Sequence, residues 1–173
     1  MDRRHREQAR LACQISIGLM AGIFSVVPVV SASPVQDTTG KVVKASGDFT
    51  VTPMAGQAPK GGMRTEITSN STNNVIPWKD FSVGEKEQVR FDQGNQTNNY
   101  LNVVTGQGTS QIAGSIEGGK DVYIVNPHGV MFGKNAEVNV GNLYVSTQDA
   151  AKAAAAFTSS TNPTGSSVLS AAG

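Results

Sequence analysis

Thiol chemistry is almost absent from this sequence of 173 residues, because its one cysteine, Cys13, lies in an apolar run near the N-terminus. Disulfide frameworks, cysteine zinc sites and thiol catalysis are therefore excluded for the rest of the chain. Histidine is scarce as well, since His128 is the only one after His5. Aromatic residues make up 6% of the chain and charged residues 16%, whereas glycine occurs 19 times. This composition favours a turn-rich β fold held by hydrogen-bond ladders and stacked side chains.

The sequence also lacks an excess of charge of one sign. Its formal net charge is +1, and from Ser33 onward ten basic and eleven acidic residues give a net charge of −1. Nucleic-acid binding needs a basic face or stripe, which this distribution does not provide. We therefore expect no nucleic-acid partner.

The first 32 residues are typical of a cleavable signal peptide. Four arginines lie within the first ten residues, an apolar run extends from Leu11 to Val30, and Val30-Ser31-Ala32 is a small-residue cleavage site. We predict cleavage after Ala32. The alternative is a transmembrane anchor, because about 20 residues can span a bilayer. Polar residues, glycines and Pro28 within the run favour the signal peptide.

The stretch from Asp121 to Thr147 carries the clearest pattern in the sequence. Asp121–Val125 is rich in β-branched and aromatic residues and predicts a strand. Asn126-Pro127-His128-Gly129 fits a type I turn, with Asn first, Pro second and Gly fourth. Further turns at Gly133 and Gly141 follow at intervals of seven or eight residues, which leaves no room for helices.

Apolar residues recur with a period of about twenty along the chain. Short strands with such a period predict a β-solenoid, in which each coil buries its apolar face against the next. Because no motif recurs letter by letter, an up-and-down sandwich with similar turn spacing remains an alternative. Three pairs have spacings of 21, 21 and 22 residues: Val103 and Ile124, Val122 and Leu143, and Ile116 and Val138.

Other short elements flank this stretch. Within Val75–Val83 we expect Ile76, Trp78 and Phe81 to be buried, and Pro77 to place the segment at a sheet edge or in a bent strand. Ala150–Ala156 is nearly all alanine and predicts a short helix or an excursion from the coil. No polar cap follows it, which suggests the front of a longer protein or a truncated reading frame. The other strand candidates are Val42-Val43, Phe49–Thr52, Met63–Thr68, Gln88–Asp92, Tyr100–Val104, Ser110–Ile112 and Ser115-Ile116, and Ser69–Asn74 is expected to be a polar turn.

Between about Ile67 and Ala150, short motifs follow one another in a fixed order. They are Ile76-x-Trp78-x-x-Phe81-x-Val83, Glu87-x-Val89-x-Phe91-x-Gln93, Leu101-Asn102-x-Val104-x-Gly106, Ser110-x-Ile112-x-Gly114-x-Ile116, Asn126-Pro127-His128-Gly129-Val130-x-Phe132-Gly133-x-x-Ala136-x-Val138-x-Val140 and Leu143-x-x-Ser146-Thr147. This set resembles the N-terminal secretion (TPS, or haemagglutination activity) domain of two-partner secretion exoproteins, the filamentous haemagglutinin family. Two positions depart from the family pattern, because His128 stands where a second Asn is usual and Val103 where Arg is usual.

The resemblance implies an all-β fold, namely a right-handed parallel β-helix (β-solenoid) with an N-terminal β cap. It also implies a non-enzymatic function. An outer-membrane transporter would recognise the chain in the periplasm, and the folded domain would nucleate β-helix folding outside the cell. The expected domains are a signal peptide (1–32), a cap or lead-in (33–62), a β-helix secretion domain (63–150) and an Ala/Ser/Thr-rich tail at an incomplete domain end (151–173).

The partners implied by the resemblance are the general secretory export machinery and an outer-membrane transporter with periplasmic polypeptide-transport-associated domains. A host-cell or glycan receptor would bind through a missing downstream region, as in an adhesin. The implied location is outside the cell or on the surface of a double-membraned bacterium, and no cofactor or metal is expected. The motif residues expected to serve secretion and folding are Trp78, Phe81, Leu101, Asn102, Asn126, Pro127, His128, Gly129, Phe132 and Gly133.

A β-helical protein that binds or cleaves polysaccharide is the alternative function. Asp92, Glu117 and Asp121 could approach one another across coils, but no second histidine, cysteine or basic cluster supports a site. We interpret these carboxylates as exposed loop charges and His128 as a solvated turn residue. A decayed fragment without a function of its own is the third alternative.

Two structural hypotheses complete the prediction. Asn126, Asn139 and Asn142 lie at or near turns and are expected to form hydrogen-bonded ladders from coil to coil. The region from Met63 to Phe91 is expected to pair with the transporter by β-augmentation during secretion.

Overall fold

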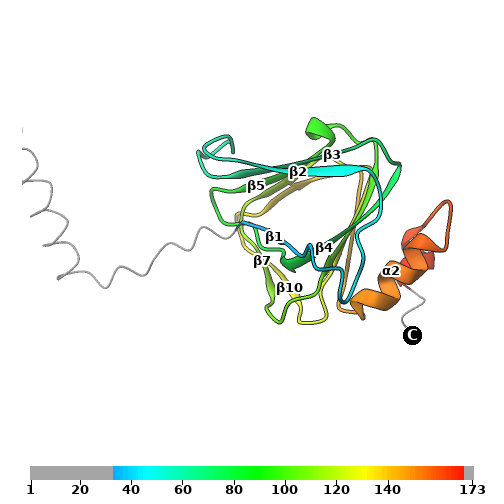
Figure 1. Ribbon diagram of the computed structural model, residues 1–173. Coiled ribbons are helices and arrows are strands. Elements are labelled where there is room, and N and C mark those ends of the chain that lie inside the picture. The colour runs from blue at the N-terminus through cyan, green and yellow to red at the C-terminus, as the bar shows by residue number, and fades with distance from the viewer. Residues whose placement is uncertain (1–32, 170–173) are drawn as a thin grey trace, which may run out of the picture. The chain divides into compact units, whose positions relative to one another are not determined.

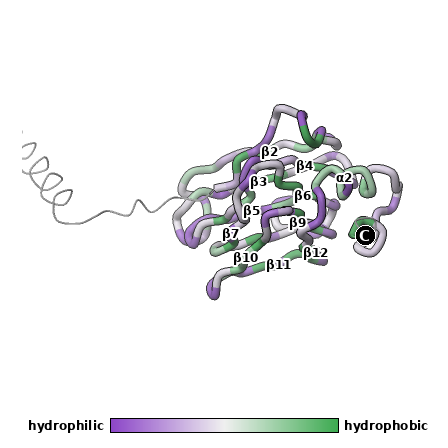
Figure 2. The backbone as a smooth tube through the Cα atoms, turned by 90° about the horizontal axis from the view of Figure 1, so that it is seen from below, coloured by the Kyte–Doolittle hydropathy of each residue, from purple (hydrophilic) through white to green (hydrophobic). Residues whose placement is uncertain are grey.

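Stacked β-strands form the framework of the computed structural model, which describes residues 33–169 (Figure 1). The chain winds through about four coils of a β-solenoid, as predicted. Three sheets form its faces: sheet A has the order β1-β4-β6-β9-β12, sheet B the order β2-β3-β5-β8-β11, and sheet C pairs β7 with β10. In a perpendicular view, the coils stack from β2 at one end to β11 and β12 at the other (Figure 2).

Each coil contributes short strands joined by tight corners. Sheet A consists of β1 (Val35–Gln36), β4 (Asn73–Asp80), β6 (Asn99–Val104), β9 (Asp121–Val125) and β12 (Asn142–Ser146). Sheet B consists of β2 (Phe49–Met54), β3 (Arg64–Ser69), β5 (Gln88–Phe91), β8 (Ser115–Glu117) and β11 (Glu137–Asn139). The remaining elements are β7 (Ser110–Ile112), β10 (Val130–Phe132), the 3₁₀ turn η1 (Asp92–Gly94), α2 (Ala150–Thr158) and α3 (Gly165–Leu169).

Parallel pairing holds neighbouring coils in register. One predicted spacing was wrong by one residue, because Val103 pairs with Val125 and not with Ile124. A shift of one residue exchanges the two faces of a strand. Val103 and Val125 accordingly point outward together, whereas Ile124 lies in the inner core. The other two spacings are confirmed: Val122 lies opposite Leu143, and Ile116 lies opposite Val138.

Two strands that run against the others close the N-terminal end. β1 pairs antiparallel with β4, and β2 pairs antiparallel with β3. Of the two positions expected for Pro77, a sheet edge or a bent strand, the edge was wrong, because β4 lies between β1 and β6. The carbonyl of Pro77 accepts the N–H of Asp37 at 2.9 Å. Since the nitrogen and oxygen of one strand residue face the same neighbour, the missing donor of Pro77 faces two-residue β1 and leaves the ladder with β6 intact.

Apolar side chains fill both the inside of the solenoid and the space beneath its helices. Inside, Ile76, Trp78 and Phe81 are 0% exposed, which confirms the predicted anchors. Outside, α2 covers sheet A, where Phe157 meets Tyr123 with ring centroids 5.7 Å apart. The middle of sheet A is therefore buried on both faces, and every residue of β6 is buried.

The predicted helix near Ala150 is confirmed as α2. Its N-cap residue Asp149 accepts the N–H of Lys152 through its carboxylate at 2.9 Å, which satisfies a donor of the first turn. Two other predictions failed, because Val42-Val43 is a bend and β4 already begins at Asn73, inside the expected turn. The predicted signal peptide lies outside the described residues. None of the helices between residues 33 and 169 is long and apolar enough to cross a membrane.

Candidate functional site

A hydrogen-bonded connection through the core joins three successive coils. The indole N–H of Trp78 in β4 donates to Asn102 Oδ1 in β6 at 3.0 Å. Asn102 Nδ2 in turn donates to the backbone oxygen of Tyr123 in β9 at 3.0 Å. Trp78 and Asn102 are both 0% exposed, and a buried amide is tolerated because its oxygen and nitrogen are both bonded. The pair fixes the register of sheet A from inside.

Phe81 and Leu101 pack on opposite sides of sheet A. Phe81 meets the ring of Trp78 edge-on, with centroids 5.3 Å apart, in the corner after β4. Leu101 belongs to the outer cluster beneath α2, although Asn102 beside it points into the core. Adjacent residues of one strand point to opposite faces, so the Leu-Asn motif serves both clusters.

The Asn-Pro-His-Gly motif forms the predicted turn between β9 and β10. The N–H of Gly129 donates to the backbone oxygen of Asn126 at 3.0 Å and closes the turn. The Asn126 side chain is 0% exposed, and its Oδ1 accepts the N–H of His128 at 2.9 Å. Its Nδ2 donates to the oxygen of Gly108 at 2.9 Å and to Ser110 Oγ at 3.0 Å. Because Gly108 and Ser110 belong to the preceding coil, Asn126 ties one corner to the next.

Pro127 and His128 project from this corner into solvent, as we predicted for His128. The backbone oxygen of His128 accepts the hydroxyl of Thr109 at 3.0 Å, so its main chain also contacts the preceding coil. A catalytic histidine needs a partner that orients its ring near a substrate. The exposed position on the outside of a corner favours the structural interpretation.

Phe132 and Gly133 belong to the last described coil, which exposes the cross-section of the core. Phe132 is 43% exposed, although its partner Ile112 in the preceding coil is 0% exposed. Val138 and Val145 are 37% and 39% exposed and also align with buried core residues. The N–H of Gly133 donates to the oxygen of Ile112 at 2.7 Å and turns the chain towards β11. This end therefore presents an apolar stacking surface.

A row of polar side chains, not grouped by the sequence analysis, runs along the start of sheet A. The strand registers place Asn73 opposite Asn99 and Asp121 opposite Asn142, and the next residues, Tyr100 and Val122, lie opposite each other between these two pairs. Asn99 Nδ2 donates to Asn73 Oδ1 at 2.9 Å, and Asn142 Nδ2 donates to Asp121 Oδ1 at 2.8 Å. Between these bonds, Asn99 Oδ1 is buried and has no hydrogen-bond partner among the described residues. Asp121 has no side-chain N–H to offer, so the row is interrupted in the middle.

The predicted asparagine ladders are confirmed only in part. Asn126 and Asn142 bond to the preceding coil, as expected. Asn139 lies exposed in β11, where its backbone oxygen accepts the N–H of Gly118 at 2.9 Å. The short spacing of the turns identified Asn126 and Asn142. It did not identify Asn73 and Asn99, which lie in strands.

Asp92 is a structural carboxylate and not the exposed loop charge that we predicted. It is partly buried, has a φ of 52°, and accepts the phenol of Tyr100 at 2.6 Å. It also accepts the backbone and side-chain N–H groups of Asn98 at 2.8 and 3.0 Å. Burial, followed by the hydrogen bond and charge of Asp92, raises the pKa of Tyr100, so its phenol stays neutral.

Glu117 and Asp121 lie in or at strands and are also partly buried, which corrects the same prediction. Glu117 Oε2 accepts Gln88 Nε2 at 3.3 Å, and Asp121 accepts Asn142 as described above. Within residues 33–169, no three His, Cys, Asp or Glu side chains are grouped to hold a metal ion. The arrangement therefore favours packing between coils over chemistry.

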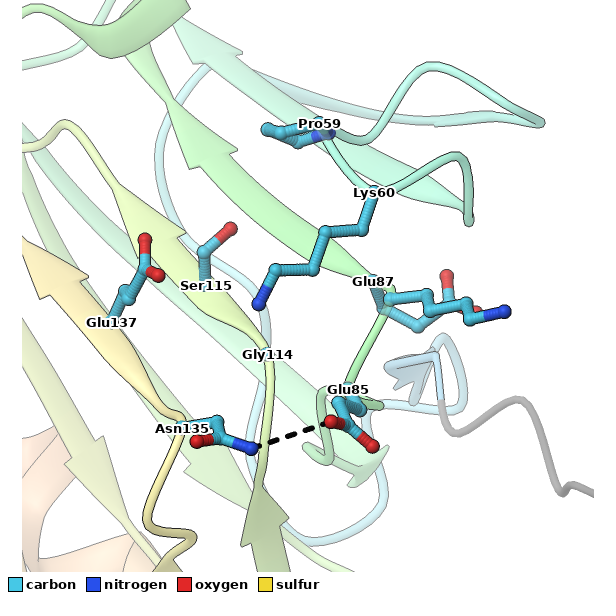
Figure 3. A pocket seen from close by; sticks show the side chains of 9 residues that line it. Pro59, Lys60, Glu85, Glu87, Gly114, Ser115, Asn135 and Glu137 are labelled. Atoms are coloured by element: carbon cyan, nitrogen blue, oxygen red, sulfur yellow. Dashed lines mark hydrogen bonds between the residues drawn. The ribbon is translucent and has the colours of Figure 1, made fainter.

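A small pocket lies over sheet B, where the loop with Pro59 and Lys60 approaches Gly114 (Figure 3). Asn135 Nδ2 donates to Glu85 Oε1 at 3.4 Å on its rim. The cavity measures about 40 Å³, whereas small-molecule sites usually measure about 300 Å³ or more. It is large enough for little more than one water molecule, so it does not support a glycan site.

Known proteins resemble the chain over much of its solenoid. The profile of the TPS secretion domain family matches residues 36–171. Two proteins of Haemophilus influenzae, both named heme/hemopexin-binding protein and one from strain Rd, are 39% and 34% identical over 83 and 88 residues. These matches cover 48% and 51% of this chain but only 9% and 10% of the relatives, so the chain spans about a tenth of their length. The crystal structure of the HMW1 secretion domain from Haemophilus influenzae matches 61% of this chain and 27% of that chain, at 28% identity and a TM-score of 0.48.

Proposed function

Because the chain belongs to the TPS secretion domain family, we propose that it is the non-enzymatic secretion domain of an adhesin-like two-partner secretion exoprotein. TPS domains work with a transporter in the outer membrane, and the exoproteins that carry them are secreted across the outer membrane of Gram-negative bacteria. The family is non-enzymatic in general. For this chain, the proposed route begins with signal-peptide export and cleavage after Ala32 and ends outside the cell or on its surface.

The apolar surface of the last described coil is the observation that carries this proposal. Phe132, Val138 and Val145 occupy inward positions of the solenoid and are exposed only because they lie at its end. A following coil of parallel strands would cover these side chains and pair with the free edges of β10, β11 and β12. We therefore propose that the domain nucleates the folding of β-helical coils that follow it.

The proposed transporter carries periplasmic polypeptide-transport-associated domains and binds the chain before it folds. In the folded state β3, β4 and β5 each pair with a strand on both sides. A transporter strand can therefore pair with Met63–Phe91 by β-augmentation only while these strands are unpaired. This requirement makes recognition by the transporter and folding of the domain mutually exclusive.

Co-expression with an outer-membrane transporter of two-partner secretion tests the proposal. We expect secretion that depends on the transporter, and a reduced secreted fraction when Asn126→Ala and Pro127→Ala are combined. His128→Ala is the matched control, because its side chain is exposed in the same turn. Secretion that does not depend on the transporter would contradict the proposed function, whereas unchanged secretion of the double variant would exclude only the role of the corner.

The alternative activities have no comparable support. Heme or hemopexin binding, which names two relatives, is not carried over, because the chain spans about a tenth of those proteins. A polysaccharide function predicts retention or cleavage of acidic polysaccharides, with activity lost in Asp92→Asn or Asp121→Asn. Such a loss, measured on folded protein, would overturn the proposed non-enzymatic function.

A further inference from the structure

Ser33, the first residue after the predicted cleavage site, is seated on the folded solenoid. Its hydroxyl donates to Glu87 Oε2 at 3.3 Å, although the two residues are 54 positions apart. Ser33 and Val35 also line an apolar pocket at the N-terminal end, together with Val51 and Met63. The point at which the chain enters the described structure is therefore bonded to Glu87 and lies beside an apolar pocket.

Glu87 is held rigidly in the corner before β5. Glu87 is only 7% exposed. Its backbone N–H donates to the oxygen of Gly84 at 2.9 Å, and its backbone oxygen accepts the N–H of Ser115 from the next coil at 3.1 Å. A carboxylate in such a place is stabilised by each positive charge that comes close to it.

We propose that signal-peptide cleavage after Ala32 creates an α-ammonium group at Ser33 that forms an ion pair with Glu87. Three bonds separate the nitrogen of a serine from its Oγ, so the two atoms are about 3 Å apart. With the hydroxyl 3.3 Å from Glu87 Oε2, the nitrogen lies no more than about 6 Å from the same carboxylate oxygen. Before cleavage this nitrogen belongs to a neutral amide. Cleavage thus adds a positive charge at the capped end of the solenoid.

The pairing determines how the stability of the folded protein changes with pH. It raises the pKa of the α-amino group above its usual range of about 7.7–8.0. The contribution to stability is present below that range and is lost as the pH rises through the raised pKa. The other charged groups around the pocket next to Glu87 are Lys60, Lys86, Glu85 and Glu137, so the local charge is mixed. The inference depends on the cleavage site but not on the transporter, so it can fail independently of the proposed function.

Trace acetylation of the exported full chain tests the inference. After N-terminal sequencing, the folded protein is labelled with acetic anhydride over a pH series, and mass spectrometry follows the N-terminal peptide. We expect the midpoint for labelling at Ser33 to lie at higher pH in the folded than in the denatured protein. Glu87→Gln should remove this difference, whereas the matched control Glu85→Gln and the hydroxyl variant Ser33→Ala should keep it.

Three results would overturn the inference. They are a mature N-terminus other than Ser33, equal midpoints in the folded and denatured wild-type protein, and a midpoint that Glu87→Gln leaves unchanged. The second comparison uses only the wild-type chain, so it decides the question even if Glu87→Gln does not fold.

Discussion

The two ends of the solenoid differ in how far the apolar side chains of the core are covered. At the N-terminal end, antiparallel strands β1 and β2 cover the first parallel coil, and Trp78 is 0% exposed. At the C-terminal end of the described residues, Phe132 occupies an equivalent inward position and is 43% exposed. At the N-terminal end the apolar core is covered, whereas at the other end Phe132, Val138 and Val145 stay exposed and a further coil could stack on them. From this difference we infer that the N-terminal end contributes more to stability, and that the last described coil is the end on which a further coil can stack.

The largest expected difference between the two ends is in the free energy of unfolding lost when one aromatic ring is removed at each end. We expect Trp78→Ala to lower the free energy of unfolding by about 3–5 kcal/mol, because it leaves a core cavity and removes the donor to Asn102. Phe132→Ala should cost only about 1 kcal/mol, since 43% of the residue is already exposed. Urea denaturation measures both values, and equal losses would mean that the two ends do not differ in stability.

The corner at Asn126 provides the next largest effect. Asn126→Ala removes three side-chain hydrogen bonds and should lower the free energy of unfolding by about 1–3 kcal/mol. His128→Ala, in the same turn, should change it by less than about 0.5 kcal/mol. Thermal and urea unfolding of the pair measure the difference. A comparable loss in both variants would show that the turn is held by the imidazole as well.

The capped end should also respond to acid. Asp37 Oδ2 accepts the hydroxyl of Thr105 at 2.6 Å, and its Oδ1 accepts the hydroxyl and the N–H of Thr39. These hydrogen bonds lower the pKa of Asp37 to about 2. Their contribution is present above the ordinary carboxyl pKa and is lost as the pH falls towards the lowered value.

Asp37→Asn should therefore lower the melting temperature at neutral pH, with a cost of about 1–2 kcal/mol. The gap from wild type should close between about pH 4 and the pKa of Asp37 near 2. Calorimetry over this range measures the gap, with Glu137→Gln, at an exposed carboxylate in β11, as the control. A gap that stays constant down to the lowest pH would exclude the charged form of Asp37 as its source.

The smallest effect should be a gain. Asp121→Asn would supply an amide N–H to the buried Asn99 Oδ1 while its oxygen still accepts Asn142, so the interrupted row would become continuous. We expect the free energy of unfolding to rise by about 0.5–1.5 kcal/mol. Urea unfolding beside Asp92→Asn, which should destabilise the fold, checks the direction. A lower free energy of unfolding in Asp121→Asn would contradict this expectation and would indicate that Asn99 Oδ1 already has another donor.

Local rules predicted those parts of the fold that depend on local contacts. The strand Asp121–Val125 and the turn at Asn126 follow from β propensity and turn chemistry, and both are confirmed. The cover of α2 on sheet A could not be predicted, because an alanine-rich helix gives no signal of what it packs against. Asn102 was expected only as a motif residue, since its position inside the core becomes intelligible only through Trp78, one coil away. The antiparallel cap is likewise a long-range property.

Trp78 is the only tryptophan in the chain, and it lies in the first parallel strand of sheet A. Its fluorescence therefore reports when the capped end becomes dry. Tyr123 and Tyr144 stack with ring centroids 4.7 Å apart between the last two coils of sheet A, so near-ultraviolet circular dichroism reports on the other end. The protein thus has two intrinsic spectroscopic probes, one near each end of the solenoid. The order in which the two signals change after dilution from denaturant shows which end folds first.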